Sequence, residues 1–301
     1  MKLPTKVVVS TLLVCSLGIL GCRKPGPIEL QDNAPSELID VQTISSVSLL
    51  SNEADTTGVV ARDRSSYFGE LIVAGVRYDG PNASHTVSVA RAMFRNKSDS
   101  VIYNGKLLGF RTLFIGGVFI DGLPLYSVPT RIKLGLGLGD TVVGVHYLLV
   151  NRDGVGGRGF TFTPSHIHQW RNSPGSGVVL NVDTRSPNEV RVVRPTPLNP
   201  IQQREGLPIE WTGGGDTVRI IISVLEAGRP PDPIMGIRIH SDSKRVTIPS
   251  KIMRLLPTER SSSFIFTFVS QTQSAVQVSG FADMILVHSA SIHSILLTVQ
   301  R

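Results

Sequence analysis

The chain has 301 residues, of which 41% are hydrophobic and 6% aromatic, and its formal net charge is +7. Its 30 lysine and arginine residues are scattered, and no basic run is longer than two residues. Nucleic-acid binding normally needs clustered positive charge with aromatic side chains on which bases stack, so the composition argues against it. About 280 residues follow residue 21, which is enough for two domains of ordinary size.

The first 22 residues have the pattern of an export signal. Two lysines, Lys2 and Lys6, precede an apolar run over residues 7–20. This run is shorter than the roughly 20 residues of a transmembrane helix and is typical of a signal-peptide core. It ends in Ile19-Leu20-Gly21-Cys22, which resembles the lipobox of bacterial lipoproteins. The resemblance implies a signal peptide over residues 1–21, a diacylglycerol on the Cys22 thiol, and a membrane anchor made of acyl chains.

Two further expectations follow from this N-terminus. Arg23, rather than an aspartate, follows Cys22, and this resembles the sorting pattern that sends lipoproteins to an outer membrane. We therefore expect a lipid-anchored protein of the cell envelope, at the outer membrane. Removal of the signal peptide takes Cys15 with it and Cys22 carries lipid, so no disulfide is expected in the mature chain.

Residues 22–66 are predicted to be a tether, mostly disordered. The segment is rich in proline, glycine and polar residues, and such a composition buries too little apolar surface to offset the entropy of ordering it. Residues 37–50 show some alternation of apolar and polar side chains. They are interpreted as a strand that joins the sheet or as a short helix, and the sequence leaves both alternatives open.

Residues 67–187 are predicted to be an N-terminal β-sandwich domain, because apolar residues there recur with period two between turn residues. Asp121-Gly122 is a hairpin-type dipeptide, since both positions tolerate positive φ. The expected strands cover residues 71–78, 86–94, 113–120, 131–138, 141–150, 159–163, 166–170 and 178–182.

Residues 188–301 are predicted to be a C-terminal immunoglobulin-like β-sandwich domain. Prolines 195, 197 and 200 mark residues 188–207 as a boundary, because proline cannot donate into a central ladder. A helical turn is expected over residues 250–256, with Ser250 as its N-cap and Pro257 ending it. The expected strands cover residues 207–212, 217–225, 245–248, 263–270, 275–280, 284–288 and 291–300. The predicted fold class is therefore all-β, with two β-sandwich domains after a signal peptide and tether.

The second domain resembles the C-terminal sandwich of uncharacterised bacterial exported lipoproteins. The resemblance depends on the segments at residues 206–213, 218–222, 247–250 and 255–257, and it covers about a third of the chain. A weaker resemblance places Asp121-Gly122 and the segment that ends at Trp170 in a partner sandwich. Both imply a fold and no activity, since one fold hosts many functions.

Trp211 and Trp170 are predicted to differ in burial. Trp211 alternates with Ile209 and Leu207, so its ring is expected in the core. Trp170 is flanked by His168 and Arg171 near a loop and is expected to be partly exposed.

His166 and His168 lie two residues apart, which on a strand puts both imidazoles on one face. They are interpreted as a polar strand face, with half of a metal site as the sharper alternative, its third ligand taken from His146 or Asp153. The candidate binding surface is His166, His168 and Trp170.

No motif predicts catalysis. Glycine-rich residues 135–139 and 154–159 are followed by strands rather than by the helix N-terminus that a phosphate loop needs. Nothing selects a glycosidase pair among Asp140, Asp153, Glu205 and Glu210. We expect no catalytic residue, no metal and no cofactor. The leading hypothesis is a non-catalytic binding or structural module with an envelope protein or glycan as partner, and the alternative is a glycan-active envelope enzyme with its site near His166, His168 and Trp170.

Overall fold

The computed structural model describes residues 28–29, 38–43, 67–133, 140–152, 159–173, 177–215 and 217–301. The fold is all-β, and its sheets pack face to face as sandwiches, as predicted. Among these residues none forms a helix long and apolar enough to cross a bilayer. Cys22 and the predicted signal peptide lie outside the described residues.

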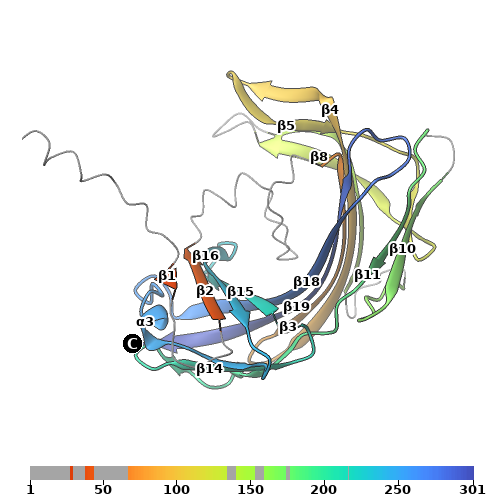
Figure 1. Cartoon of the computed structure of the whole chain (residues 1–301). Coiled ribbons are helices and arrows are strands. Elements are labelled where there is room, and N and C mark those ends of the chain that lie inside the picture. The colour runs from red at the N-terminus through yellow and green to blue at the C-terminus, as the bar shows by residue number, and fades with distance from the viewer. Residues whose placement is uncertain are drawn as a thin grey trace, which may run out of the picture.

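One long sheet of 12 strands dominates the molecule, with the path β1-β2-β16-β15-β18-β19-β3-β4-β9-β8; β13 pairs with β19, and β5 with β4. Figure 1 shows this sheet as a curved surface. Its strands are β1 (Ile28–Glu29), β2 (Leu38–Thr43), β3 (Gly69–Asp79), β4 (Ser84–Tyr103), β5 (Lys106–Thr112), β8 (Tyr126–Lys133), β9 (Asp140–Arg152), β13 (Ile201–Gln202), β15 (Thr217–Val224), β16 (Asp232–His240), β18 (Ser263–Val276) and β19 (Ile285–Gln300).

Two small sheets lie on the outer side of this curve, one near each end (Figure 1). The first has the order β11-β10-β6-β7 and the second β12-β14-β17. Their strands are β6 (Val118–Ile120), β7 (Leu123–Pro124), β10 (Ile167–Asn172), β11 (Asn181–Arg185), β12 (Arg191–Arg194), β14 (Leu207–Thr212) and β17 (Arg245–Ile248). The remaining element, α3 (Ser250–Met253), follows β17.

Each small sheet covers a separate apolar core. The N-terminal core packs β10, β11 and β6 against β3, β4 and β9, and Trp170 lies in it. The C-terminal core packs β12, β14 and β17 against β15, β16, β18 and β19, and Trp211 lies in it. The predicted boundary at residues 187/188 lies between Val182 of the N-terminal core and Val190 of the C-terminal core, but the N-terminal core also contains Val278, Phe281, Ile285 and Val287 from beyond it. It does not divide the long sheet, in which β19 pairs in parallel with β3 from Ile285↔Gly69 to Ile295↔Asp79.

Strand β19 crosses both sandwiches with one face. Near its start Ile285 and Val287 enter the N-terminal core. Near its end Ile295, Leu297 and Val299 enter the C-terminal core. Between them, on the same face by the two-residue period, lie three buried polar residues, Ser289, Ser291 and His293. The two cores are therefore separated by a polar strip.

Several expected strands are corrected by the structure. Residues 159–163 form no strand; Phe162 packs over Gly75 of β3, where a Cβ atom would meet the Phe162 ring at 2.3 Å. The backbone N–H of Phe162 donates to Ser88 Oγ (2.9 Å) instead of to a ladder partner. Of the expected strand over residues 113–120, only Val118–Ile120 is a strand. The strands expected at residues 284–288 and 291–300 are one continuous strand that begins at Ile285, and β18 extends to Val276.

Other elements were not predicted from the sequence. The β16 strand begins just after Pro231 and contains Pro233, but a register shift opposite Ile222 and Ser223 accommodates that proline. The β12 strand lies inside the proline-rich boundary. Within the predicted tether, residues 38–43 form β2 and pair with β16, which settles the choice between strand and helix there.

Two local predictions can be compared directly. The helix covers Ser250–Met253 and begins after Pro249, without a side-chain cap, so the assignment of Ser250 as N-cap was wrong. Asp121 (φ 50°) and Gly122 (φ 78°) do form the turn of the β6–β7 hairpin, as the Asp-Gly dipeptide predicts.

Candidate functional site

Of the predicted binding surface, His166 is exposed, whereas His168 and Trp170 are buried. Trp170 is fully buried (0% exposed) in the N-terminal core, so the prediction of a partly exposed ring was wrong. The reason is the position of β10, which pairs with β6 on one side and with β11 on the other. On this central strand His168 and Trp170 share the inward face, although Gln169 between them and Arg171 after them are polar.

The structure brings His166 and His168 together, with ring centroids 5.1 Å apart. His166 precedes β10 and is exposed, whereas His168 is buried. His146, one of the two expected third ligands, lies on β9 with Nδ1 3.1 Å from Thr130 Oγ1. The side chain of Asp153 lies outside the described residues. Asp121, which the sequence analysis assigned only to a turn, is the third residue of this cluster.

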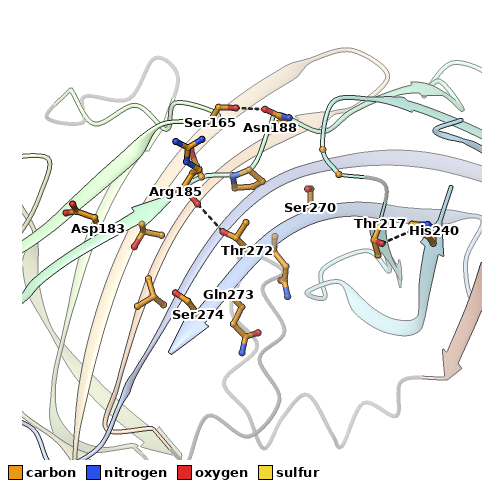
Figure 2. Close-up of a pocket in the computed structure, with 17 residues that line it drawn as sticks. Ser165, Asp183, Arg185, Asn188, Thr217, His240, Ser270, Thr272, Gln273 and Ser274 are labelled. Atoms are coloured by element: carbon orange, nitrogen blue, oxygen red, sulfur yellow. Dashed lines mark hydrogen bonds between the residues drawn. The ribbon is translucent and has the colours of Figure 1, made fainter. Parts of the chain in front are cut away.

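A polar hollow of about 710 Å³ lies between the two small sheets, and we call it the junction groove. Figure 2 shows it between β11 and the loops of the C-terminal half, with β18 along its floor. Its lining side chains carry mainly hydroxyl and amide groups. The lining residues are Ser165, Asp183, Thr184, Arg185, Ser186, Pro187, Asn188, Gly214, Gly215, Thr217, His240, Ser270, Gln271, Thr272, Gln273, Ser274 and Val287.

Hydrogen bonds hold the walls of the junction groove in place. Thr272 Oγ1 donates to the Arg185 carbonyl at 3.0 Å, which ties β18 to β11. Thr217 Oγ1 lies 3.1 Å from His240 Nδ1 (Figure 2). The Ser165 hydroxyl donates to Asn188 Oδ1 on the remaining wall. The groove is thus bounded by residues far apart in the sequence.

The floor of the junction groove is a strand edge. The β18 strand pairs with β19 along its whole length, but with β15 only from Phe264 to Val269. Over residues 270–276 no described strand pairs with the other edge of β18. Residues 271–275 are exposed there. An edge of this kind presents backbone N–H and C=O groups to a new strand.

The charge in the junction groove is low. Of its ionisable residues, Asp183 accepts a hydrogen bond from Arg171 at 3.2 Å. The other two are Arg185 and His240. A ligand of high net charge therefore finds little to recognise, whereas a ligand that offers backbone or amide hydrogen bonds finds many partners.

The polar strip of β19 links the small β12-β14-β17 sheet to the long sheet. Ser291 Oγ accepts the backbone N–H of Val190 at 2.9 Å, and His293 Nδ1 accepts that of Val192 at 2.8 Å. Because Nδ1 accepts, Nε2 carries the proton and donates to Asp79 Oδ2 at 2.8 Å.

The environment of the polar strip lowers the pKa values of His293 and Asp79. Burial lowers the pKa of His293, against the opposing effect of Asp79. Burial by itself would raise the pKa of Asp79, but hydrogen bonds from Ser84, His293 and Arg77 together lower it. The native state therefore favours a neutral His293 beside an ionised Asp79.

The carboxylates considered for a glycosidase site do not form a described pair. Glu210 forms an ion pair with Arg245 on the surface (3.0 Å), and Glu205 lies in the turn after β13. The side chains of Asp140 and Asp153 lie outside the described residues.

Comparison with known proteins gives little guidance. No family model matches the chain, and no curated protein matches it. Among solved structures, the yeast delta-COP-I mu-homology domain covers 77% of this chain and 97% of its own, at 10% identity and a TM-score of 0.22. That score is too low for any conclusion about this chain.

The sequence analysis missed the junction groove. One signal was available: Ser270-Gln271-Thr272-Gln273-Ser274 is a run of five polar residues within a strand. Such a run is unusual for a strand that is buried on one face and marks an exposed edge.

Proposed function

We propose that this protein is a lipid-anchored lipoprotein of the cell envelope, at the outer membrane, and that it acts as a non-catalytic binding module. The anchor in this proposal is the acylated Cys22, and the binding surface is the junction groove. The observation that supports a binding role is the open polar hollow of about 710 Å³, whose floor is a strand edge that no described strand pairs with.

The partner that fits this groove best is an extended segment of another envelope protein. An added strand would hydrogen-bond to the backbone of β18 over residues 270–276. Hydroxyl and amide side chains, such as Thr272 and Gln273, would contact its side chains without demanding a particular charge.

A glycan is the less favoured partner. Sugar binding normally uses exposed aromatic rings as stacking platforms, and the described residues that line the junction groove include no tryptophan, tyrosine or phenylalanine. The glycan-active enzyme that we considered as the alternative also lacks a platform at Trp170, which is buried.

The anchor is tested by fractionating cells that express Cys22→Ser. We expect this variant to leave the membrane pellet, because each buried CH₂ of an acyl chain contributes about 0.8 kcal/mol to anchoring. Cys15→Ser is the matched control and should stay in the pellet, since Cys15 lies within the predicted signal peptide. Retention of Cys22→Ser in the pellet after a high-salt wash would contradict the anchor.

The binding surface is tested by site-specific photo-crosslinking in intact cells. A photoreactive amino acid at Gln273, on the groove floor, should capture a discrete protein adduct. The control position is Arg229, which is exposed in the turn between β15 and β16 and does not line the groove. Equal adducts from both positions, or none from Gln273, would refute the groove as the binding surface.

A further inference from the structure

Three side chains that can bind a metal converge at one end of the N-terminal sandwich. Asp121, His166 and His168 each offer one ligand atom, and these atoms all lie within 4.8 Å of one another. They come from the β6–β7 turn, from the residue before β10, and from β10 itself. The strand pairing between β10 and β6 brings the turn beside the two histidines.

Backbone hydrogen bonds fix Asp121 at this position. Its own N–H donates to the Gln169 carbonyl at 2.9 Å, and its Oδ1 accepts the Gln169 N–H at 2.8 Å. The second carboxylate oxygen, Oδ2, then lies 2.7 Å from His168 Nδ1. These hydrogen bonds therefore hold the Asp121 carboxylate next to the His168 imidazole.

Hydrogen bonds with Ser186 fix the backbone of His166 in the same way. Its backbone N–H donates to Ser186 Oγ at 3.0 Å, and its carbonyl accepts the Ser186 N–H at 2.8 Å. The imidazole itself remains exposed to solvent. The geometry thus combines a fixed backbone with a side chain that can adjust by the short distance a bound ion requires.

His168 provides the buried side of the cluster. Its ring lies beside Phe160 and Phe162, with centroid distances of 6.1 and 5.7 Å. Its Nε2 is buried, and within the described part of the chain it has no hydrogen-bond partner. Burying the imidazole of His168 costs desolvation free energy that an apolar residue at this position would not cost. The polar partner of this imidazole is Asp121.

We propose that Asp121, His166 and His168 bind a divalent transition-metal ion, with zinc as the first candidate. Two imidazole nitrogens and one carboxylate oxygen are a ligand set that zinc accepts, with a fourth position open to water. Asp121 and His166 are exposed, so an ion reaches the cluster from solvent. This inference goes beyond the proposed binding role and does not depend on it.

The test is a zinc titration of the purified full-length mature chain without a polyhistidine tag, after removal of metal by a chelator. Calorimetry should give one equivalent of bound zinc for the wild type. His166→Ala should weaken zinc binding at least tenfold, because it removes a ligand. Since His166 is exposed, this variant should keep its fold, which circular dichroism checks.

Two more variants distinguish a site from scattered histidines. Asp121→Asn keeps a hydrogen-bond acceptor beside His168 but loses the charge, and it should also weaken binding. His240→Ala is the matched control, because His240 and Asp242 form an exposed pair (3.6 Å) that is not part of the three-residue cluster. It should bind zinc like the wild type.

Thermal unfolding gives an independent readout. Zinc bound to the native state should raise the Tm of the wild type and of His240→Ala, and should raise that of His166→Ala less at the same zinc concentration. Weak zinc binding that is the same in the wild type and in His166→Ala would overturn the proposal. So would an equal loss of affinity in His240→Ala.

Discussion

The two cores differ in how much of the chain they need. The C-terminal core is assembled, among the described residues, from residues between Val190 and Val299. The N-terminal core combines residues between Leu71 and Val182 with Val278, Phe281, Ile285 and Val287 from the C-terminal half. Within the described part of the chain, the C-terminal core is therefore built from the C-terminal half alone, whereas the N-terminal core also needs residues from that half. The stability of the N-terminal sandwich should depend on that of the C-terminal one, and the reverse dependence should be weaker.

The largest expected effect is at the two tryptophans. Trp211→Ala and Trp170→Ala each remove a fully enclosed ring and should each cost about 3–5 kcal/mol of unfolding free energy. Each variant leaves one tryptophan, so its fluorescence during urea unfolding reports on the other core. Trp211→Ala should lower the midpoint seen by Trp170, while Trp170→Ala should shift the midpoint seen by Trp211 less.

The references for this experiment are Trp211→Phe and Trp170→Phe. The indole N–H groups of both tryptophans are buried and have no hydrogen-bond partner among the residues that the structure describes, so phenylalanine removes a donor that forms no described hydrogen bond. Both should unfold close to the wild type. Equal shifts from the two alanine variants would show that neither core depends on the other.

The next largest effect is expected at Phe281, a residue of the C-terminal half that lies in the N-terminal core. Phe281 packs against Phe68 (centroids 4.0 Å apart) and against Phe94 (5.6 Å). Phe281→Ala should cost about 3 kcal/mol, because it leaves a cavity in the N-terminal core. In a Trp211→Phe background, Trp170 fluorescence should report this loss. A midpoint unchanged from that background would mean that the N-terminal core does not need the C-terminal half.

A smaller effect is expected at Gly75, where the loop before β10 meets the long sheet. Gly75→Ala places a methyl group 2.3 Å from the Phe162 ring and should cost roughly 1–3 kcal/mol through overpacking. Adding Phe162→Leu should restore part of that loss, because the smaller side chain makes room. A double variant as unstable as Gly75→Ala alone would show that the clash lies elsewhere.

The smallest effect concerns the polar strip between the cores, and it appears as a pH dependence. Because the pKa of His293 is lowered in the native state, the unfolded chain binds more protons below the ordinary histidine value of about 6.5. This contribution to stability is complete above that pH and is lost as the pH falls below it.

His293→Gln removes the titration but keeps an amide that can accept and donate, and it should cost about 1 kcal/mol at neutral pH. Unfolding midpoints between pH 7 and pH 5 should fall more steeply for the wild type than for this variant. His85→Gln, at a residue exposed on the long sheet, is the matched control. Parallel pH profiles for the wild type and His293→Gln would exclude His293 as the source.

The sequence predicts the local features well where one strand decides them. Apolar runs predict the positions of β3 and β9, alternation of apolar and polar residues predicts β14 and β17, and Asp121-Gly122 predicts a hairpin turn, because these features depend on residues close together in the sequence. Trp211 is buried as its alternation with Ile209 predicts.

What the sequence leaves out depends on partners far along the chain. Trp170 has polar neighbours, and only its pairing with both β6 and β11 explains its burial. The junction groove is formed by residues near 165, 185, 215 and 272, and the parallel pairing of β3 with β19 has no local signature. The β12 strand, which ends just before Pro195, and the β16 strand, which contains Pro233, are also stabilised by neighbouring strands rather than by their own propensity.

The 16-residue β19 strand has a consequence for how the protein folds. It supplies apolar residues to both cores and pairs with β3, and the side-chain hydrogen bond between these two strands joins Asp79 and His293, which are 214 positions apart. Neither core can be completed before residues 285–299 are available. Contacts of such high sequence separation slow folding, because a long loop must close before they stabilise anything. The two sandwiches should therefore form together, once the segment at residues 285–299 is in place.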